Sequence, residues 1–444
     1  MAQDGEGSGE LRARLEREAT PIVHLGLFDL DGGLRERRLA KADLLEALAD
    51  LSFVNVLPHW DLGERVFGAG PFVGEAIRPD PASLRPYPFE ADACLLLCDY
   101  AGATRALSPR ALLEAQIAKA AAAGLSAKAA FEFEFLVLEE TAESLRAKGY
   151  EGLASHAPAN RCWGAQTAAV DAGFVAALHE SLKAGGIDPF GLGVELGPGC
   201  FEATLRHRDP LAAAEEAALF RLYTKAFCRR AGKTASFMAQ LGSAYPGLSG
   251  HLHLSLWTAA GRNLFFAPGG GLSEEGGAFV AGALRASRAA FPMIANTVNA
   301  YRRLVPGNWA PRGFGWALEN YAAAIRAVPA SEAHCRLEFR LPAADCNPFL
   351  VLALMLAGGL DGLAQGLAPP PQIRGGSPEL LPENADPVPT DLLSATGIMA
   401  ASAEAERLLG AAFVAHFCRS RRIEELALRR EVSAAERARY LEAT

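Results

Sequence analysis

The amino-acid sequence predicts an α+β protein built from two domains. The chain has 444 residues, of which 50% are hydrophobic, enough for a large core and two or three domains. The first hundred residues mix strand-like and helix-like segments, and further helices then alternate with strands. We therefore expect a small N-terminal domain over residues 1–104 and a large domain over residues 105–444.

The composition argues against several classes of partner. The formal net charge is -8, the pI is near 5.7 and no basic block stands out, so we expect neither nucleic acid nor a membrane surface. No run approaches the ~20 apolar residues of a membrane span, and the polar N-terminus resembles neither a signal nor a transit peptide. The eight cysteines lack zinc-site spacing and are typical of reduced core thiols, which predicts a cytoplasmic protein.

The small domain begins with a hairpin signal. Residues 22–30 are strand-like, Asp31-Gly-Gly33 forms a turn, and residues 34–39 complete the pair. The other expected elements are a tail leading into a short helix (1–20), a short helix (41–51), a Gly- and Pro-rich stretch that is mostly loop (58–88) and a buried strand (91–100).

The large domain opens with a helix whose ends are both marked. Ser108 is its N-cap, Pro109 occupies the first helical position, and Gly124 ends it. The elements expected after it are helices at 166–185, 211–232, 276–300 and 348–365, strands at 131–138, 192–205, 234–240, 250–257 and 335–341, a Pro/Gly-rich segment at 366–390 and a helical tail.

The strand Phe131-Glu-Phe-Glu-Phe135 organises the rest of the chain. Its period of two places Glu132 and Glu134 on one face and the three phenylalanines on the other. Two neighbouring carboxylates repel each other unless a cation, a proton or an arginine lies between them. The strand therefore has either a solvated acidic face or half of a metal site whose other ligands lie elsewhere.

Three further segments gather acids, imidazoles and arginines. They are Glu195 and Glu202 around a Gly-Pro-Gly turn, His251, His253 and Ser255 on one face of residues 250–256, and Arg336, Glu338 and Arg340 on one face of residues 336–340. A single residue of this kind is usually a satisfied polar group, but the combination indicates one site. Oxygen-rich ligands favour Mg²⁺ or Mn²⁺ over zinc. Arginines beside such ions suit phosphoryl transfer.

The order and spacing of these motifs resemble the glutamine synthetase family over nearly the whole chain. The matching segments are Glu132–Phe135, Glu195–Glu202, His251–Leu256, Asn299–Leu304, Ala310-Pro311, Ala324–Arg326, Arg336–Arg340 and Asn347–Leu350. The resemblance implies a β-grasp-like N-terminal domain and a catalytic domain with a curved antiparallel sheet. It also implies a homo-oligomer, a dodecamer of stacked hexameric rings, with each active site shared between neighbouring subunits.

The resemblance also implies a role for each matched residue. Glu134, Glu195 and Glu202 would bind one metal, and Glu132, His251 and Glu338 a second, so that two or three Mg²⁺ or Mn²⁺ ions serve each site. His253, Ser255 and Arg336 would contact ATP, Arg326 and Arg340 the transferring phosphoryl group, and Arg303 the glutamate carboxylate. The implied reaction is phosphorylation of the glutamate γ-carboxylate by ATP, followed by attack of an amine on the acyl phosphate.

The chain departs from this family where ammonium would bind. The family has a glutamate in a Pro-Gly-Tyr-Glu-Ala-Pro-like flap, but here Trp309 occupies that place in the segment Pro306–Pro311. The family's N-terminal Asp-Gly-Ser-Ser segment is replaced by Val66–Phe72. An indole favours an alkyl or aryl amine, which gains roughly 0.8 kcal/mol per buried methylene and a cation–π contact. The alternative is that Trp309 only packs the flap.

Other departures affect the acid substrate and regulation. Tyr321 replaces an arginine near the phosphoryl group, which makes it a second candidate for the amine pocket. Family residues near the acid substrate are replaced by Val194, Cys200 and Pro246-Gly247, although Arg303 is retained and favours glutamate. No tyrosine lies between Tyr321 and Tyr440, so adenylylation is not expected.

The sequence therefore predicts an ATP- and metal-dependent ligase that joins glutamate to an organic amine in amine or polyamine catabolism. One alternative is a true glutamine synthetase that uses ammonia. The other is a non-catalytic structural or regulatory relative, against which the complete set of metal positions argues.

Overall fold

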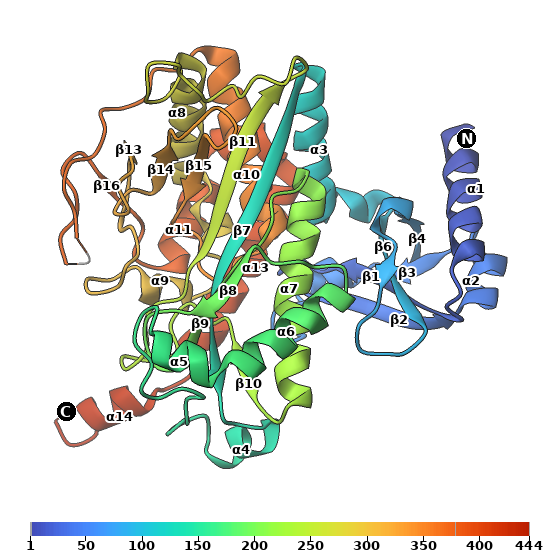
Figure 1. The fold of residues 1–444 in the computed structure, drawn as a ribbon, viewed down its shortest axis with the longest axis horizontal. Coiled ribbons are helices and arrows are strands. Elements are labelled where there is room, and N and C mark those ends of the chain that lie inside the picture. Colours follow the sequence, from blue (N-terminus) through green and yellow to red (C-terminus); the bar gives the residue numbers. More distant parts are fainter. Residues whose placement is uncertain (1, 378, 444) are drawn as a thin grey trace.

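The N-terminal part of the chain forms its own sheet (Figure 1). The structure is a computed structural model that describes residues 2–377 and 379–443. The elements of this part are α1 (Ala2–Arg17), β1 (Ile22–Phe28), β2 (Leu34–Ala40), α2 (Lys41–Ala47), β3 (Ser52–Val54), β4 (Gly74–Pro79), β5 (Arg85–Pro86) and β6 (Ala93–Tyr100). The strand order is β2-β1-β6-β4-β3, with β5 paired to β6.

The hairpin and the buried strand predicted for this part are confirmed. β1 and β2 pair antiparallel from Ile22↔Ala40 to Phe28↔Leu34, and every residue of β6 is buried. The prediction of a loop over residues 58–88 is wrong in part, because β4 lies within it and pairs with both β3 and β6. Its one glycine and its one proline are the first and last residues of the strand, where they do not interrupt the ladder.

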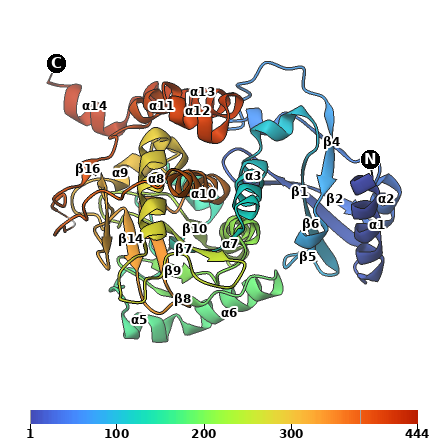
Figure 2. The same ribbon diagram turned by 90° about the horizontal axis from the view of Figure 1, so that it is seen from above.

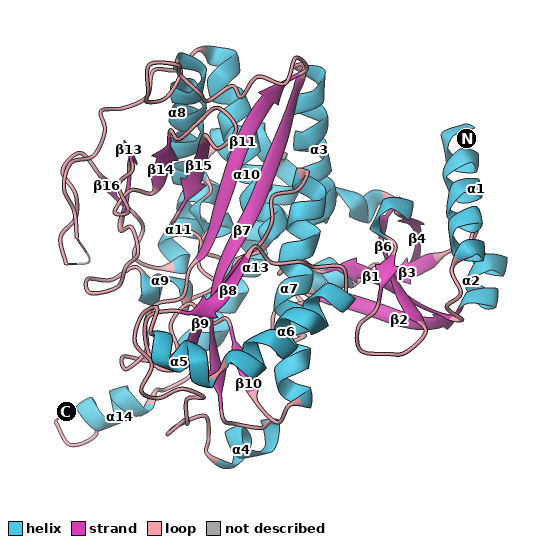
Figure 3. Ribbon diagram, in the orientation of Figure 1, coloured by secondary structure: helices cyan, strands magenta, loops and turns pink. Residues whose placement is uncertain are grey.

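The remaining chain folds around a second, larger sheet (Figure 3). Its strands are β7 (Leu125–Leu138), β8 (Gly191–Val194), β9 (Cys200–Thr204), β10 (Thr234–Ser236), β11 (Gly250–Thr258), β13 (Trp316–Leu318), β14 (Ile325–Val328) and β15 (Arg336–Phe339). Among the described residues the order is β13-β14-β15-β11-β7-β9-β8, with β10 beside β7. The pairings are antiparallel apart from β13 with β14, so the predicted antiparallel catalytic sheet is confirmed in its main part.

Helices surround this sheet. They are α3 (Pro109–Ala122), α4 (Ala142–Ala147), α5 (Ala165–Val170), α6 (Ala172–Ala184), α7 (Pro210–Arg230), α8 (Glu274–Ala289), α9 (Ala300–Arg303), α10 (Pro348–Gln365), α11 (Leu392–Ala400), α12 (Ala403–Leu409), α13 (Ala411–Arg429) and α14 (Ala434–Tyr440), and a small ribbon pairs β12 (Gly313–Phe314) with β16 (Asp386–Pro387). Figure 2 shows α3, α7, α8 and α10 between the large sheet and the layer of α11 to α13.

The capped helix predicted at residue 108 is confirmed. The Ser108 hydroxyl accepts a hydrogen bond from the Ala111 amide at 3.2 Å, and Gly124 has a left-handed φ of 73° just beyond the helix. The helix predicted over 166–185 is in fact two, α5 and α6, which meet at Asp171. The predicted domain boundary falls in the turn that joins β6 to α3, and its exact position stays a prediction.

The helix α10 is the central helix of the core. It is apolar and long enough to cross a membrane by length and composition, yet most of it is buried inside the protein. It packs against α8, α3 and α7. Gly358 and Gly362 bring its backbone against that of α8, where an added Cβ would lie within 2.7 Å of backbone atoms. Its hydropathy is therefore explained by packing within the protein.

Candidate active site

The strand β7 lies at the centre of the site because β11 and β9 pair with its two edges. The register places His251 of β11 opposite Glu132 and Glu202 of β9 opposite Glu134. The next strand, β15, pairs with β11 and brings Glu338 to the same face. Residues directly opposite each other in an antiparallel pair point to the same side of the sheet. Side chains far apart in the sequence are therefore gathered on one face.

The other face of β7 is its anchor in the core. Phe131, Phe133 and Phe135 are fully buried. Phe133 stacks on Phe220 of α7 with ring centroids 5.9 Å apart, and Phe135 packs against Phe237 at 5.4 Å. Aromatic pairs at such separations stabilise a core beyond their buried area. The alternation predicted for this strand is confirmed, and its phenylalanine face holds the carboxylate face in position.

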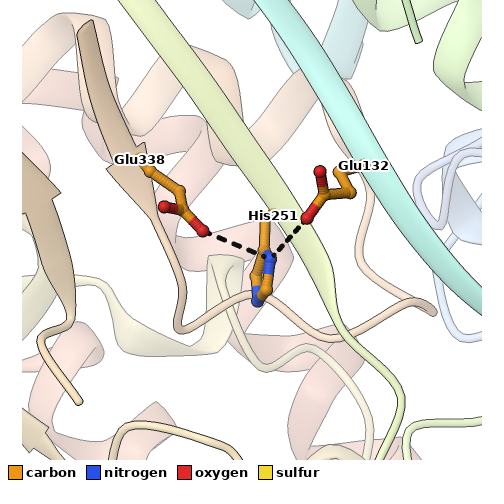
Figure 4. A group of neighbouring side chains, drawn as sticks. All are labelled: Glu132, His251 and Glu338. Atoms are coloured by element: carbon orange, nitrogen blue, oxygen red, sulfur yellow. Dashed lines mark hydrogen bonds and ion pairs between the residues drawn. The ribbon is translucent and has the colours of Figure 1, made fainter. Parts of the chain in front are cut away.

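Glu132, His251 and Glu338 form a compact group (Figure 4). His251 Nδ1 lies 3.2 Å from Glu132 Oε1 and 3.5 Å from Glu338 Oε1, and the potential ligand atoms all lie within 4.8 Å of one another. The Thr204 hydroxyl donates to Glu132 Oε2 at 3.0 Å. The Glu132 side chain is only 20% exposed, so the alternative of a solvated acidic face is wrong for this strand.

The charges in this group favour a divalent cation. Burial and the nearby Arg340 guanidinium lower the pKa of His251 to about 4, which leaves the imidazole neutral at neutral pH with a lone pair for a metal. Burial by itself raises the pKa of Glu338, but the positive charges of Arg340 and of His251, which is protonated at acid pH, outweigh it and lower the pKa to about 2. His251 Nε2 is buried and has no hydrogen-bond partner among the described residues. Two carboxylates and an imidazole suit Mg²⁺ or Mn²⁺.

The second predicted set, Glu134, Glu195 and Glu202, is less compact than the first among the described residues. Burial and repulsion from Glu132, Glu134 and Glu195 raise the pKa of Glu202 to about 9, which shows that the four acids share one region. Glu134 Oε2 accepts a hydrogen bond from the Ser249 amide at 2.5 Å. Among the described residues, only the Glu132 group brings three ligand atoms within 4.8 Å. Glu134 and Glu195 are each held by hydrogen bonds from the protein.

The two arginines predicted to bind the phosphoryl group both contact one carboxylate, that of Glu338. Arg326 Nη1 donates to Glu338 Oε2 at 2.7 Å, and Arg340 pairs with the other oxygen of Glu338. The ring of Tyr321 lies beneath both guanidinium groups, 4.1 Å from Arg326 Cζ and 5.1 Å from Arg340 Cζ. Arg326 also donates to Glu319 Oε2 at 3.0 Å. The tyrosine that replaces an arginine therefore supports these two cations by cation–π contact.

Arg303 lies deeper than the other arginines and is 1% exposed. Its Nη1 donates to the Leu341 carbonyl and its Nη2 to the Ser249 hydroxyl, both at 2.9 Å. Its Nε has no hydrogen-bond partner among the described residues. Burial lowers its pKa to about 10, and nearby Glu134 opposes that change. To bind a substrate carboxylate, Arg303 would therefore use its Nε or move its side chain, and this role stays a prediction.

The residues predicted to contact ATP follow the same strands outward. His253 Nε2 lies 3.8 Å from Glu132 Oε2, and Arg336 Nε donates to His253 Nδ1 at 3.3 Å. The Ser255 hydroxyl accepts from the Trp257 indole at 2.9 Å. The structure brings His253 and Arg336 together at the edge of the group formed by Glu132, His251 and Glu338, and the roles of all three predicted ATP contacts stay predictions.

Trp309 and Tyr321, the predicted amine-pocket residues, line one cavity of about 450 Å³. Trp309 is 60% exposed and Tyr321 54%. Leu380 and Leu381 contribute to the same wall. Because Tyr321 also contacts Arg326 and Arg340, this cavity adjoins the side of the site that is predicted to bind the phosphoryl group.

Three residues close to the predicted ligands were missed by reasoning from the sequence. The Cys162 thiol and the Trp163 indole both donate to Glu195, and Glu319 pairs with Arg326. Cys162 and Trp163 lie in a loop before α5 without any periodic pattern, so no sequence signal identified them. Glu319 has a left-handed φ of 49°, a strain that only the structure reveals.

Comparison with known proteins identifies the family. The profile described as "Glutamine synthetase, catalytic domain" matches residues 106–440. A glutamate–isopropylamine ligase from Pseudomonas sp is 30% identical, over 98% of this chain and 97% of its own length. A γ-glutamylethanolamide synthetase from Streptomyces coelicolor is also 30% identical, over 94% and 92%.

A solved structure agrees with these relatives. The ligand-free form of a protein named GmaS superimposes with a TM-score of 0.83 and 25% identity, over 98% of this chain and 99% of that one. A further structure of that protein is a complex with ADP. The profile match, the full-length relatives and the site on β7, β9, β11 and β15 lead to one conclusion: the chain belongs to the glutamine synthetase family, and its catalytic domain is that of a carboxylate–amine ligase.

Proposed function

We propose that this protein joins the γ-carboxylate of glutamate to an organic amine other than ammonia, at the expense of ATP. The observation that carries the proposal is Trp309, which lines the cavity beside the arginines. By the family resemblance of the flap segment, it stands where glutamine synthetases have a glutamate. The two full-length relatives named above act on isopropylamine and ethanolamine by name, which supports an amine of this size.

The residues present fit two divalent cations. Glu132, His251 and Glu338 would hold one, and Glu134, Glu195 and Glu202 would hold the other. Bound there, Mg²⁺ or Mn²⁺ would neutralise phosphate oxygens of ATP and make the terminal phosphoryl group easier to transfer. The orphaned His251 Nε2 and the mutually repelling carboxylates are features that a cation would satisfy.

The two arginines on Glu338 supply positive charge for the transferring group. Arg326 and Arg340 are held by Glu338 and by the ring of Tyr321, so that little reorganisation is needed when negative charge develops. In the proposed reaction the terminal phosphoryl group of ATP passes to the glutamate γ-carboxylate and ADP is released. The amine nitrogen then attacks the acyl carbon, phosphate leaves, and the nitrogen loses its extra proton.

The apolar part of the cavity wall bears on which amine attacks. Glu319 is a carboxylate on the lining of this cavity, but it is already paired with Arg326. Ammonium placed against Trp309, Leu380 and Leu381 would therefore lose hydration and have to compete with Arg326 for that carboxylate. An alkyl or aryl group would bury apolar surface there, worth roughly 0.8 kcal/mol for each methylene. The site therefore favours organic amines, in keeping with a role in amine or polyamine breakdown.

The test is phosphate release from ATP in the presence of Mg²⁺ and glutamate, with ammonium, alkyl, aryl and polyamine substrates compared. We expect the highest kcat/KM for an organic amine. The highest kcat/KM for ammonium would favour a true glutamine synthetase. If Mn²⁺ binds but no amine supports phosphate release from ATP, the result would favour a non-catalytic relative or a different acid substrate. Glu134→Ala should abolish turnover, and unchanged turnover would contradict the metal assignment.

We propose further that the protein works in the cytoplasm as stacked rings. The cysteines support the location, since all eight are free. Exposed Trp309 and Tyr321 support a site that a neighbouring subunit completes. Light scattering on the purified protein measures the assembly, and a monomer with full activity would refute the shared site.

A further inference from the structure

Both carboxylate oxygens of Glu195 are held by a loop that the proposed reaction does not yet use. The Cys162 thiol donates to Glu195 Oε1 at 3.0 Å, and the Trp163 indole Nε1 donates to Glu195 Oε2 at 2.7 Å. The amide of Leu196 donates to Oε1 at 2.9 Å. Two of these three donors come from a segment more than thirty positions earlier in the chain, so chain connectivity does not impose the contacts.

Packing does not explain the conformation of Trp163. Its side chain is 78% exposed, so it contributes little to the core, although tryptophan is a residue that usually buries most of its surface. Its φ of 51° lies in the left-handed region, which is unfavourable for a bulky residue. The indole N–H of Trp163 points at the buried carboxylate of Glu195. This hydrogen bond is the evident compensation for the strain and exposure of the tryptophan.

The loop that carries these donors is tied to the turn between β8 and β9. Asn160 Nδ2 donates to the carbonyls of Glu195 at 2.6 Å and Gly197 at 2.9 Å. The Gly199 amide donates to the Ala157 carbonyl at 3.0 Å. The loop and the turn that carries Glu195 therefore form one hydrogen-bonded unit. These bonds hold the loop that carries the two donors, Cys162 and Trp163, next to Glu195.

Counting lone pairs shows what remains for a metal. A carboxylate oxygen can accept about two hydrogen bonds. Oε1 already accepts two, from Cys162 and Leu196, whereas Oε2 accepts one, from Trp163. The free position of Glu195 is therefore on Oε2.

We propose that Cys162 and Trp163 are positioning residues that present Glu195 as a single-oxygen metal ligand through Oε2. The proposal rests on the proposed function, in which Glu195 holds one of the two divalent ions. Hydrogen bonds from outside the ligand shell orient a ligand and change metal affinity by about 10- to 100-fold when removed. This chain supplies such bonds from an indole and a thiol.

The test is to measure Mn²⁺ binding to the full-length protein, without nucleotide, by isothermal titration calorimetry. Trp163→Phe keeps the ring and removes the donor, and we expect the Kd of one Mn²⁺ to rise about tenfold while the other stays unchanged. Cys162→Ala should weaken the same ion, and Cys162→Ser, which restores a donor, should recover it. Tyr150→Phe is the matched control, since Tyr150 is also an exposed aromatic residue with a left-handed φ, of 64°.

Glu195→Gln separates failure of the inference from failure of the proposed function. If Glu195→Gln weakens one Mn²⁺ but Trp163→Phe and Cys162→Ala bind like the unmodified protein, the positioning role is wrong and the metal assignment stands. If Glu195→Gln binds both ions unchanged, the metal assignment fails and the positioning role fails with it. If Trp163→Phe weakens both ions alike and lowers the metal-free Tm below that of Tyr150→Phe, the residue is structural and the proposal is overturned.

Discussion

Metal binding should release protons and become stronger as the pH rises, because Glu202 is protonated at neutral pH in the metal-free protein. Burial and the charges of Glu132, Glu134 and Glu195 raise the pKa of Glu202 from 4.5 to about 9. A carboxylate must lose its proton to bind a divalent cation. His251, with a pKa of about 4, is already neutral in this range and adds no pH dependence.

The size of the effect follows from linkage. One proton displaced on binding changes the binding free energy by about 1.4 kcal/mol per pH unit, which is about tenfold in Kd. The pKa of Glu202 is higher in the folded than in the unfolded chain, so the metal-free fold binds the extra proton. Its contribution to stability is therefore present at acid pH and is lost as the pH rises from 4.5 to about 9. Bound metal replaces the proton and offsets that loss.

The assay is calorimetric titration with Mn²⁺ at about pH 6, about pH 7 and about pH 8, in buffers with different ionisation enthalpies. The buffer dependence of the heat gives the number of protons released, which we expect to be about one for the ion bound by Glu202. Glu202→Gln has no proton to release, so its weaker binding should vary much less with pH. Any pH dependence that remains in Glu202→Gln measures the titration of other groups.

An Mn²⁺ affinity that stays constant over this range, without proton release, would refute the reasoning. It would mean that Glu202 is ionised in the metal-free protein or does not contact the ion. A pH dependence that persists unchanged in Glu202→Gln would assign the proton to another carboxylate of the cluster.

Three further changes test the pocket, the arginine pair and the core. Trp309→Ala should lower kcat/KM for apolar amines by about fourfold for each methylene it contacts and leave ammonium unaffected; equal losses across an alkylamine series would contradict the pocket. Glu338→Gln should cost about 3 kcal/mol of unfolding free energy in urea, because Arg326 and Arg340 lose their buried counter-charge; an unchanged midpoint would contradict it. Phe133→Ala should cost about 3–5 kcal/mol in urea, and a loss below about 1 kcal/mol would show that the anchor is dispensable.

The local pattern of the chain was enough to predict the faces of β7. Alternation separates Glu132 and Glu134 from the phenylalanines whatever the strand packs against, because successive side chains of a strand point to opposite sides. The capped helix at Ser108 was predictable for the same reason, since a cap depends on a few adjacent residues. The site residues on β11 and β15 were predicted as strand faces, and their pairing with β7 was implied only by the family resemblance.

Features that depend on distant contacts were missed. β13 and β14 are strands of three and four residues, too short to show a period. They exist because β15 provides an edge for β14, and β14 in turn provides one for β13. β4 lies in a stretch of glycine and proline that indicated a loop, and its pairing with β6 outweighs that composition. The break between α5 and α6, at Asp171, also left no clear mark in the sequence.

The sequence by itself determined which side chains share a strand face, where the capped helix α3 begins and ends, and that acids, imidazoles and arginines of a ligase site are all present. The tertiary structure alone decided how these faces meet and how they are charged. Register sets Glu202 against Glu134, and burial with mutual repulsion then raises the pKa of Glu202 to about 9. The loop carrying Trp163 closes on Glu195 across more than thirty residues. Periodicity is local to the chain, whereas desolvation, repulsion and hydrogen bonding depend on neighbours that only folding brings together.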